Sequence, residues 1–161
     1  MQTAFTLRRF NSSDLESVTH INRECLPENY SSFFFLDLYK RFPETFLVAE
    51  DNGEVVGYVM CRIEKGLPGF GIGLKKKGHV ISIAVLPEYQ RQGVGYALMQ
   101  EAMQSMLLYN AKECFLEVRA SNTPAVKLYK KMRFEIRRTL RGYYADGEDA
   151  YMMARKLPFK P

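Results

Sequence analysis

One strand–turn–helix segment constrains the fold more than any other part of the chain. A β-rich run over residues 79–86 ends at Pro87, a short polar turn follows, and Gly93 and Gly95 open an amphipathic helix predicted over residues 93–110. Glycine has no Cβ atom, so a ligand can closely approach the backbone there. The first N–H groups of a helix lack intrahelical partners and favour an anion such as a diphosphate. The segment therefore predicts an α/β domain with an anion site at this turn.

Glycine spacing alone leaves a plain structural turn as an alternative. A Walker A loop is excluded because no Gly-Lys-Ser/Thr sequence follows, and a Rossmann fingerprint is excluded because Leu98 stands where its third glycine would be. Arg91 lies beside the turn and can add a charge-assisted contact to a bound anion.

The remaining patterns predict a mixed α/β sheet in the order β-α-α-β-β-β-α-β-α-β-β. Asn52-Gly53 predicts a tight hairpin between two β-rich runs, and Pro27 ends the first helix. Thr123-Pro124 predicts an N-cap followed by proline at the first helical position. The predicted strands cover residues 3–9, 46–51, 54–63, 79–86, 114–119, 134–140 and 150–157, and a short helix is predicted over residues 31–42.

Residues 65–78 hold five glycines, a proline and the run Lys75-Lys76-Lys77. This composition predicts a long mobile loop. A flexible solvated connection is one interpretation. A grip on phosphate groups or on nucleic acid is the other.

Composition narrows the class of protein. The 161 residues suit a single domain over 1–161, and 47% hydrophobic with 25% charged residues excludes a disordered tail, a collagen-like fibre and a coiled coil. The net charge of +5 favours an anionic ligand without requiring nucleic acid. Three widely spaced cysteines predict reduced thiols, no disulfide framework and no metal site. With neither a signal peptide nor an apolar run of spanning length, we expect a cytoplasmic protein without a membrane partner.

The motif Gln90-x-x-Gly93-x-Gly95 resembles the acetyl-coenzyme A signature of the GNAT acetyltransferases, and the order of elements resembles theirs over essentially the whole chain. Leu26-Pro27-Glu28-Asn29-Tyr30 and the segment that begins Gly142-Tyr143-Tyr144 resemble one branch, the protein Nα-acetyltransferases related to the archaeal enzyme and the eukaryotic NatA catalytic subunit. The resemblance implies a single GNAT domain with a mostly antiparallel mixed sheet, splayed central strands and about four flanking helices.

The resemblance also implies where acetyl-CoA binds. Backbone groups of Ile83 and Val85 would pair with the pantetheine arm, and an N–H near Val85 would face the developing oxyanion. Asn122 matches a cofactor-contacting position, although a role as helix cap explains it equally well. The residues expected at the diphosphate are Gln90, Arg91, Gln92, Gly93, Val94 and Gly95.

Three residues are candidates for the chemistry. Tyr129 matches a tyrosine next to the cofactor sulfur and can protonate a thiolate, with plain core packing as the alternative. Glu117 and His79 would accept the amine proton through ordered water. The alternatives are an outward-facing Glu117 paired with Arg119 and a solvent-exposed histidine at the strand end.

The peptide is expected to bind at Leu26, Pro27, Glu28, Tyr30, Tyr143 and Tyr144. The resemblance puts Glu28 near the α-amine and the first side chain, which suggests Ser, Ala and Thr termini, with Met as a further candidate. The tyrosines would flank the peptide backbone, with ordinary packing as the alternative.

The predicted activity is direct acetyl transfer, in a ternary complex, from acetyl-CoA to the α-amine of nascent or completed polypeptide N-termini. About 14% of an α-amine is neutral at pH 7, against about 0.04% of a lysine, which favours chain termini. The alternatives are a GNAT enzyme for lysines or small amines, and a non-catalytic RNA-binding module. Residues 65–78 are candidates for contact with coenzyme A, with acidic nascent chains or with ribosomal RNA. Ribosome proximity and an auxiliary subunit stay open, and we expect the chain to be active alone.

Overall fold

The computed structural model describes residues 4–160 and holds seven strands in one sheet, in the order β1-β2-β3-β4-β5-β7-β6. The strands are β1 (Thr6–Arg9), β2 (Phe46–Asp51), β3 (Glu54–Gly66), β4 (Lys75–Val85), β5 (Glu113–Arg119), β6 (Glu135–Leu140) and β7 (Ala150–Lys156). The helices are α1 (Leu15–Cys25), α2 (Ser32–Arg41), α3 (Val94–Met106) and α4 (Thr123–Lys131). Neighbouring strands are antiparallel except for β4 and β5. The predicted order of elements and the mixed, mostly antiparallel sheet are confirmed.

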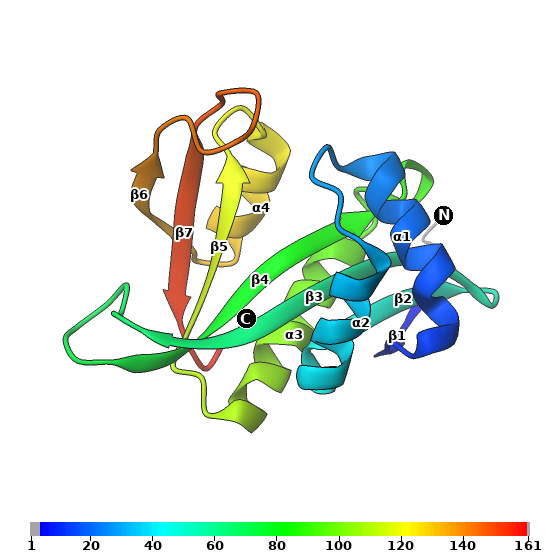
Figure 1. Cartoon of the computed structure of the whole chain (residues 1–161), viewed down its shortest axis with the longest axis horizontal. Coiled ribbons are helices and arrows are strands. Elements are labelled where there is room, and N and C mark those ends of the chain that lie inside the picture. Colours follow the sequence, from blue (N-terminus) through cyan, green and yellow to red (C-terminus); the bar gives the residue numbers. More distant parts are fainter. Residues whose placement is uncertain (1–3, 161) are drawn as a thin grey trace.

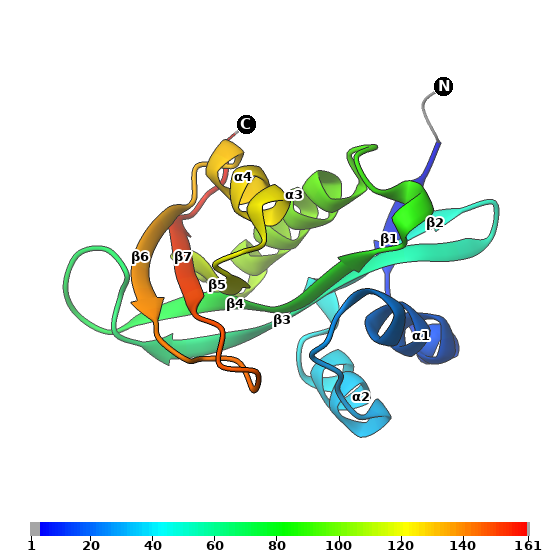
Figure 2. The same cartoon turned by 90° about the horizontal axis from the view of Figure 1, so that it is seen from above.

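Helices cover both faces of the sheet. Figure 2 shows α1 and α2 on one face and α3 and α4 on the other. Each pair builds its own core: Met99 and Met103 of α3 are fully buried on one side, and Phe35 and Tyr58 are fully buried on the other. The sheet is thus fixed between two apolar layers, which holds its strand ends in place.

The central strands β4 and β5 diverge, as predicted. Their parallel pairing covers only Lys77↔Glu113, Gly78↔Cys114 and His79↔Phe115. Beyond His79 the two strands separate toward the β4 carboxyl end (Figure 1). A gap therefore opens in the middle of the sheet, between residues that a regular ladder would join.

The predicted loop over residues 65–78 is wrong at both ends. Strand β3 continues to Gly66 and β4 begins at Lys75, and these two residues pair directly. Only residues 67–74 connect the strands. The glycine at position 78 serves packing instead of a turn, because a Cβ atom there would collide with the sulfur of Met106 in α3.

Other boundaries shift by a few residues. Helix α3 ends at Met106, before the 3₁₀ turn Leu107–Tyr109, so the predicted end at residue 110 is wrong. Asn122, and not Thr123, caps α4, because its Oδ1 accepts the N–H of Ala125 (3.3 Å). The predicted first strand begins at Thr6, and its residue 3 lies outside the described residues.

The hairpin at residues 52–53 is confirmed, with Asn52 and Gly53 both in the left-handed region (φ 50° and 80°). Among residues 4–160 no helix combines the length and apolar character that a membrane crossing needs. The cysteines are free: Cys61 and Cys114 are buried, and Cys25 is half-buried.

Candidate active site

A cleft of about 550 Å³ lies where β4 and β5 separate. Its walls come from both strands, from α4, from the α1–α2 connection and from the β6–β7 connection. Ten of the predicted site residues line it: Leu26, Pro27, Glu28, Tyr30, Ile83, Glu117, Asn122, Tyr129, Tyr143 and Tyr144. Not among its lining residues are His79, Val85, Gln90, Arg91, Gln92, Gly93, Val94 and Gly95.

Glu117 and His79 form a pair across the diverging strands. His79 Nε2 lies 2.7 Å from Glu117 Oε1, and the His79 ring stacks on Phe115 with its centroid 4.1 Å away. Both alternatives from the sequence are wrong, because Glu117 does not pair with Arg119 and His79 is only 9% exposed. Glu117 faces the cleft and His79 lies behind it.

Glu64 joins this pair and was missed in the sequence. Its Oε2 lies 2.5 Å from His79 Nδ1 and accepts a hydrogen bond from Arg62 Nε at 2.6 Å. In the β3–β4 ladder His79 is opposite Arg62, which makes Glu64 its diagonal neighbour on the same face of the sheet. The β alternation continues through Glu64 in β3, whereas the strand predicted over residues 54–63 stops one residue before it.

Tyr129 packs in the core and also lines the cleft, so core packing is confirmed and the role next to the cofactor sulfur stays a prediction. Burial raises the pKa of Tyr129 above its ordinary value. The phenol therefore keeps its proton at neutral pH and can donate it.

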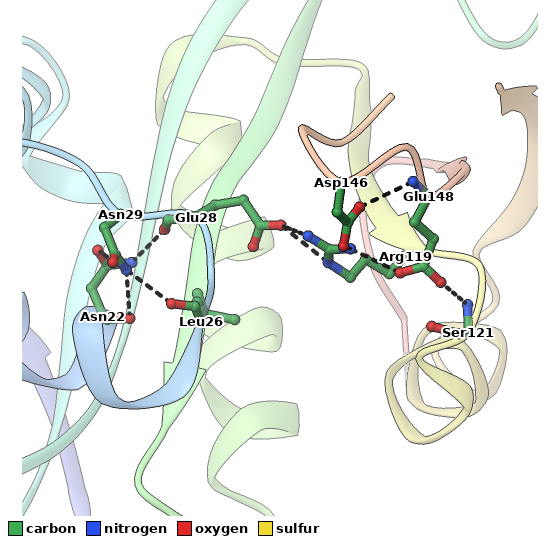
Figure 3. Close-up of polar contacts among 8 residues, drawn as sticks. All are labelled: Asn22, Leu26, Glu28, Asn29, Arg119, Ser121, Asp146 and Glu148. Atoms are coloured by element: carbon green, nitrogen blue, oxygen red, sulfur yellow. Dashed lines mark hydrogen bonds and ion pairs between the residues drawn. The ribbon is translucent and has the colours of Figure 1, made fainter. Parts of the chain in front are cut away.

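Arg119, at the end of β5, ties the two connections over the cleft together (Figure 3). Its Nη2 donates to Glu28 Oε1 (2.7 Å), and its Nη1 donates to Asp146 Oδ2 (2.8 Å) and Glu148 Oε1 (2.9 Å). Its guanidinium also lies 4.1 Å from the ring centre of Tyr144. We call these five residues the Arg119 cluster. Sequence reasoning missed it, since Arg119 was considered only as a partner of Glu117.

The tyrosines of the cleft are partly packed. Tyr30 stacks on Phe34 (4.9 Å between centroids), and its hydroxyl group donates to Ile81 O at 3.5 Å. Tyr143 meets Tyr144 edge-on at 5.0 Å and is about half exposed. Burial raises the pKa of all three tyrosines, so each presents a protonated hydroxyl group to the cleft. Packing and peptide contact are therefore compatible here.

The turn before α3 fits a diphosphate. Gly93 adopts a left-handed conformation (φ 85°) with open space where a Cβ would be, and no side chain of residues 4–160 caps the helix. The first N–H groups of α3 are thus available to an anion. The turn is braced by Gln90 Nε2, which donates to Val85 O, and by Gln92 Nε2, which donates to Glu88 O, both at 2.9 Å. Gln92 Oε1 is buried without a partner among the described residues.

Comparisons with known proteins agree with this geometry. The model of the acetyltransferase (GNAT) family matches residues 15–134. An N-alpha-acetyltransferase from Sulfurisphaera tokodaii is 51% identical over 95% of this chain and 93% of its own length.

Solved structures give the same result. Ard1 from Thermoplasma volcanium superposes with a TM-score of 0.84 at 33% identity, over 97% of this chain and 99% of its own. A chain of the NatB acetyltransferase complex bound to CoA and MES superposes with a TM-score of 0.81 at 26% identity, over 95% of this chain and 99% of its own. This chain therefore belongs to the GNAT family of acetyltransferases, and its relatives include N-alpha-acetyltransferases, as the sequence motifs predicted.

Proposed function

We propose that this protein transfers the acetyl group of acetyl-CoA directly to the α-amine of polypeptide N-termini. The observation that carries the proposal is the cleft between β4 and β5. One wall presents Glu117, backed by His79, and another presents the protonated phenol of Tyr129. A base for an amine and an acid for a thiolate thus face the same space.

The cofactor supplies an activated acetyl thioester. Our proposal assigns the diphosphate to the open turn at Gly93 and the first turn of α3, with Arg91 as a charged neighbour. Ile83, which lines the cleft, would pair with the pantetheine arm through its backbone, and so would Val85 just beyond it. Asn122 lines the cleft while capping α4, so it can serve both roles.

The residues of the cleft would then divide the reaction between them. Glu117, through an ordered water, accepts the proton that the ammonium group must lose, and His79 shares that proton through Nε2. The amine nitrogen bonds to the carbonyl carbon as the carbon–sulfur bond breaks. Tyr129 gives its phenolic proton to the departing thiolate, and the second proton, which the nitrogen must lose to become the amide, returns through water to the Tyr129 phenolate.

The cover of the cleft would select the peptide. Glu28, held by Arg119, narrows the space for the first side chain and favours Ser, Ala and Thr, with Met as a further candidate. Tyr30, Tyr143 and Tyr144 supply hydroxyl groups and flat apolar area for the first residues of a nascent or completed chain. We expect the chain to act without an auxiliary subunit, in the cytoplasm and with access to the ribosome.

A peptide library with positions one and two varied tests the proposal. Acetylation, followed by mass spectrometry, is expected on free N-termini and absent from matched peptides with a blocked N-terminus and an internal lysine. Acetylation of the lysine instead would favour the alternative GNAT activity and overturn the proposal.

Calorimetry tests the cofactor site separately. Gly93→Glu places a carboxylate in the turn and is expected to weaken acetyl-CoA binding at least tenfold. Gly53→Glu is the matched control, because Gly53 has a similar φ (80°) and equally open space but lies in the β2–β3 hairpin. Equal affinity of both variants would contradict the diphosphate assignment.

A further inference from the structure

We infer that Glu64 is a positioning residue for the reaction: it fixes the orientation and the proton of His79, so that Nε2 serves the cleft. The inference rests on the proposed function and adds a third member to the predicted pair. Glu64, His79 and Glu117 come from three different strands and lie in line, with the imidazole between two carboxylates.

Exposure gives this line a direction. The side chains of Glu117 and His79 are 16% and 11% exposed, whereas that of Glu64 is 33% exposed. Glu117 lines the cleft, and Glu64 does not. The line therefore runs from the cleft through a buried imidazole to a carboxylate that reaches solvent.

The hydrogen-bonding chemistry of imidazole shows what Glu64, the second carboxylate, does to His79. A neutral imidazole has one N–H donor and one acceptor nitrogen, and an ionised carboxylate only accepts. Glu64 therefore favours the tautomer with hydrogen on Nδ1, and the contact between Nε2 and Glu117 is then a hydrogen bond only while a proton lies between those two atoms. When the proton from the amine reaches Nε2, the imidazolium formed has a carboxylate on each side, which favours its charge.

Glu64 is itself held ionised and in place. Partial burial acts to raise the pKa of Glu64, but hydrogen bonds from Arg62 and His79 outweigh it and keep that pKa below its usual value. Stacking on Phe115 fixes the plane of the His79 ring, and the ammonium of Lys77 lies 4.5 Å from the Phe115 ring centre. Tyr30, Tyr143 and Tyr144 are further titratable groups near Glu117.

The test uses the fact that the chain contains only two histidines, His20 and His79. Nitrogen-15 NMR of the imidazoles, recorded against pH, reports the tautomer and the pKa of each. Glu64→Gln keeps an acceptor for Nδ1–H but removes the charge, so we expect the measured His79 pKa to fall by about one unit. His20, on the exposed side of α1, is the internal reference.

Kinetics complete the test. In Glu64→Gln we expect kcat to fall about three- to tenfold and the base limb of its pH profile to move to lower pH, with KM for acetyl-CoA unchanged. Glu64→Ala should lose the tautomer preference as well. Glu54→Gln, an exposed position at the other end of β3, is the matched control and should behave as wild type.

The outcomes separate the two proposals. Unchanged His79 titration and unchanged kcat in Glu64→Gln, with a wild-type protein that acetylates N-termini, would overturn the role of Glu64 alone. A wild-type protein that binds acetyl-CoA but acetylates no N-terminus would overturn the proposed function, and the role of Glu64 with it.

Discussion

Strand β5 carries a charged side chain at each end, and the two side chains hold neighbouring loops in different ways. Glu113, only 1% exposed, accepts hydrogen bonds from the backbone N–H groups of Gly69 (2.6 Å) and Phe70 (3.3 Å) in the β3–β4 connection. Arg119, at the other end, meets three carboxylates from the two connections that cover the cleft.

The difference separates stability from activity. The Glu113 end is buried, pairs with backbone dipoles and contributes nothing to the lining of the cleft. The Arg119 end lies in the wall of the cleft, and its partner Glu28 is a candidate for contact with the peptide. We therefore expect substitutions at Glu113 to change the free energy of unfolding, and substitutions at Arg119 to change peptide turnover.

The largest effect is expected for Arg119→Ala. The change leaves Glu28, Asp146 and Glu148 without their shared cation, so the two connections lose their alignment over the cleft. We expect kcat/KM for peptides to fall about 100-fold, in line with the cost of misplacing a reacting group by about 1 Å. Acetyl-CoA affinity should stay near the wild-type value by calorimetry.

Arg119→Lys refines this prediction, because it keeps the charge but not the planar guanidinium that reaches three carboxylates. Its peptide kcat/KM should lie between the values of wild type and Arg119→Ala. Arg41→Ala, in an exposed ion pair of α2, is the control for loss of a cation. Peptide kinetics of Arg119→Ala within twofold of wild type would contradict the comparison.

Glu113→Gln should act mainly on stability. The amide cannot accept both backbone N–H groups as a carboxylate does, so we expect a loss of about 1–3 kcal/mol in the free energy of unfolding. Urea denaturation measures it, with the exposed Glu101→Gln of α3 as control. A large loss of peptide turnover without a loss of stability would show that the two ends of β5 are not separate.

Acid should selectively weaken the ion pairs of the Arg119 cluster. The N–H of Glu148 and the Arg119 guanidinium hold the pKa of Asp146 below its usual value, and Ser121 with Arg119 does the same for Glu148. A carboxyl group with a lowered folded pKa contributes stability that is present above its unfolded pKa and lost as pH falls through the folded one.

The Tm difference between wild type and Arg119→Ala should therefore be full above about pH 5 and shrink below about pH 4. Thermal melting between pH 7 and pH 3 measures it. A difference that stays constant over this range would mean that the carboxylates do not contribute through their charge.

The smallest effect on acetyl-CoA binding and turnover is expected from shortening the β3–β4 connection, although this change also removes the partners of Glu113 and should lower the free energy of unfolding. Gly66 and Lys75 pair directly, so residues 67–74 can be replaced by Asn-Gly as a tight hairpin. None of these residues lines the cleft, which begins beyond His79 where β4 and β5 separate. Acetyl-CoA affinity and peptide kcat/KM should therefore stay within about twofold of the wild-type values. A clear loss of acetyl-CoA affinity would instead support the interpretation that this connection contacts coenzyme A.

Local patterns were sufficient for much of the fold. The Asn52-Gly53 hairpin, the end of α1 just before Pro27 and the open turn at Gly93 all depend on the backbone preferences of a few adjacent residues. The β3–β4 hairpin was not predicted to its full length. The glycines and lysines of residues 65–78 are typical of a loop, whereas residues 75–78 form a strand because they pair with β3, and this pairing is not visible in local composition.

The sequence by itself determined the order of elements, the open turn at Gly93 and the family, because each is encoded in short runs of residues. Only the tertiary structure decided which charges meet. Arg119 and Glu28 are 91 residues apart, and His79 lies 38 residues from Glu117 and 15 from Glu64. Strand register and the divergence of β4 from β5 bring these groups together, and both arise from packing the sheet between its two helical layers.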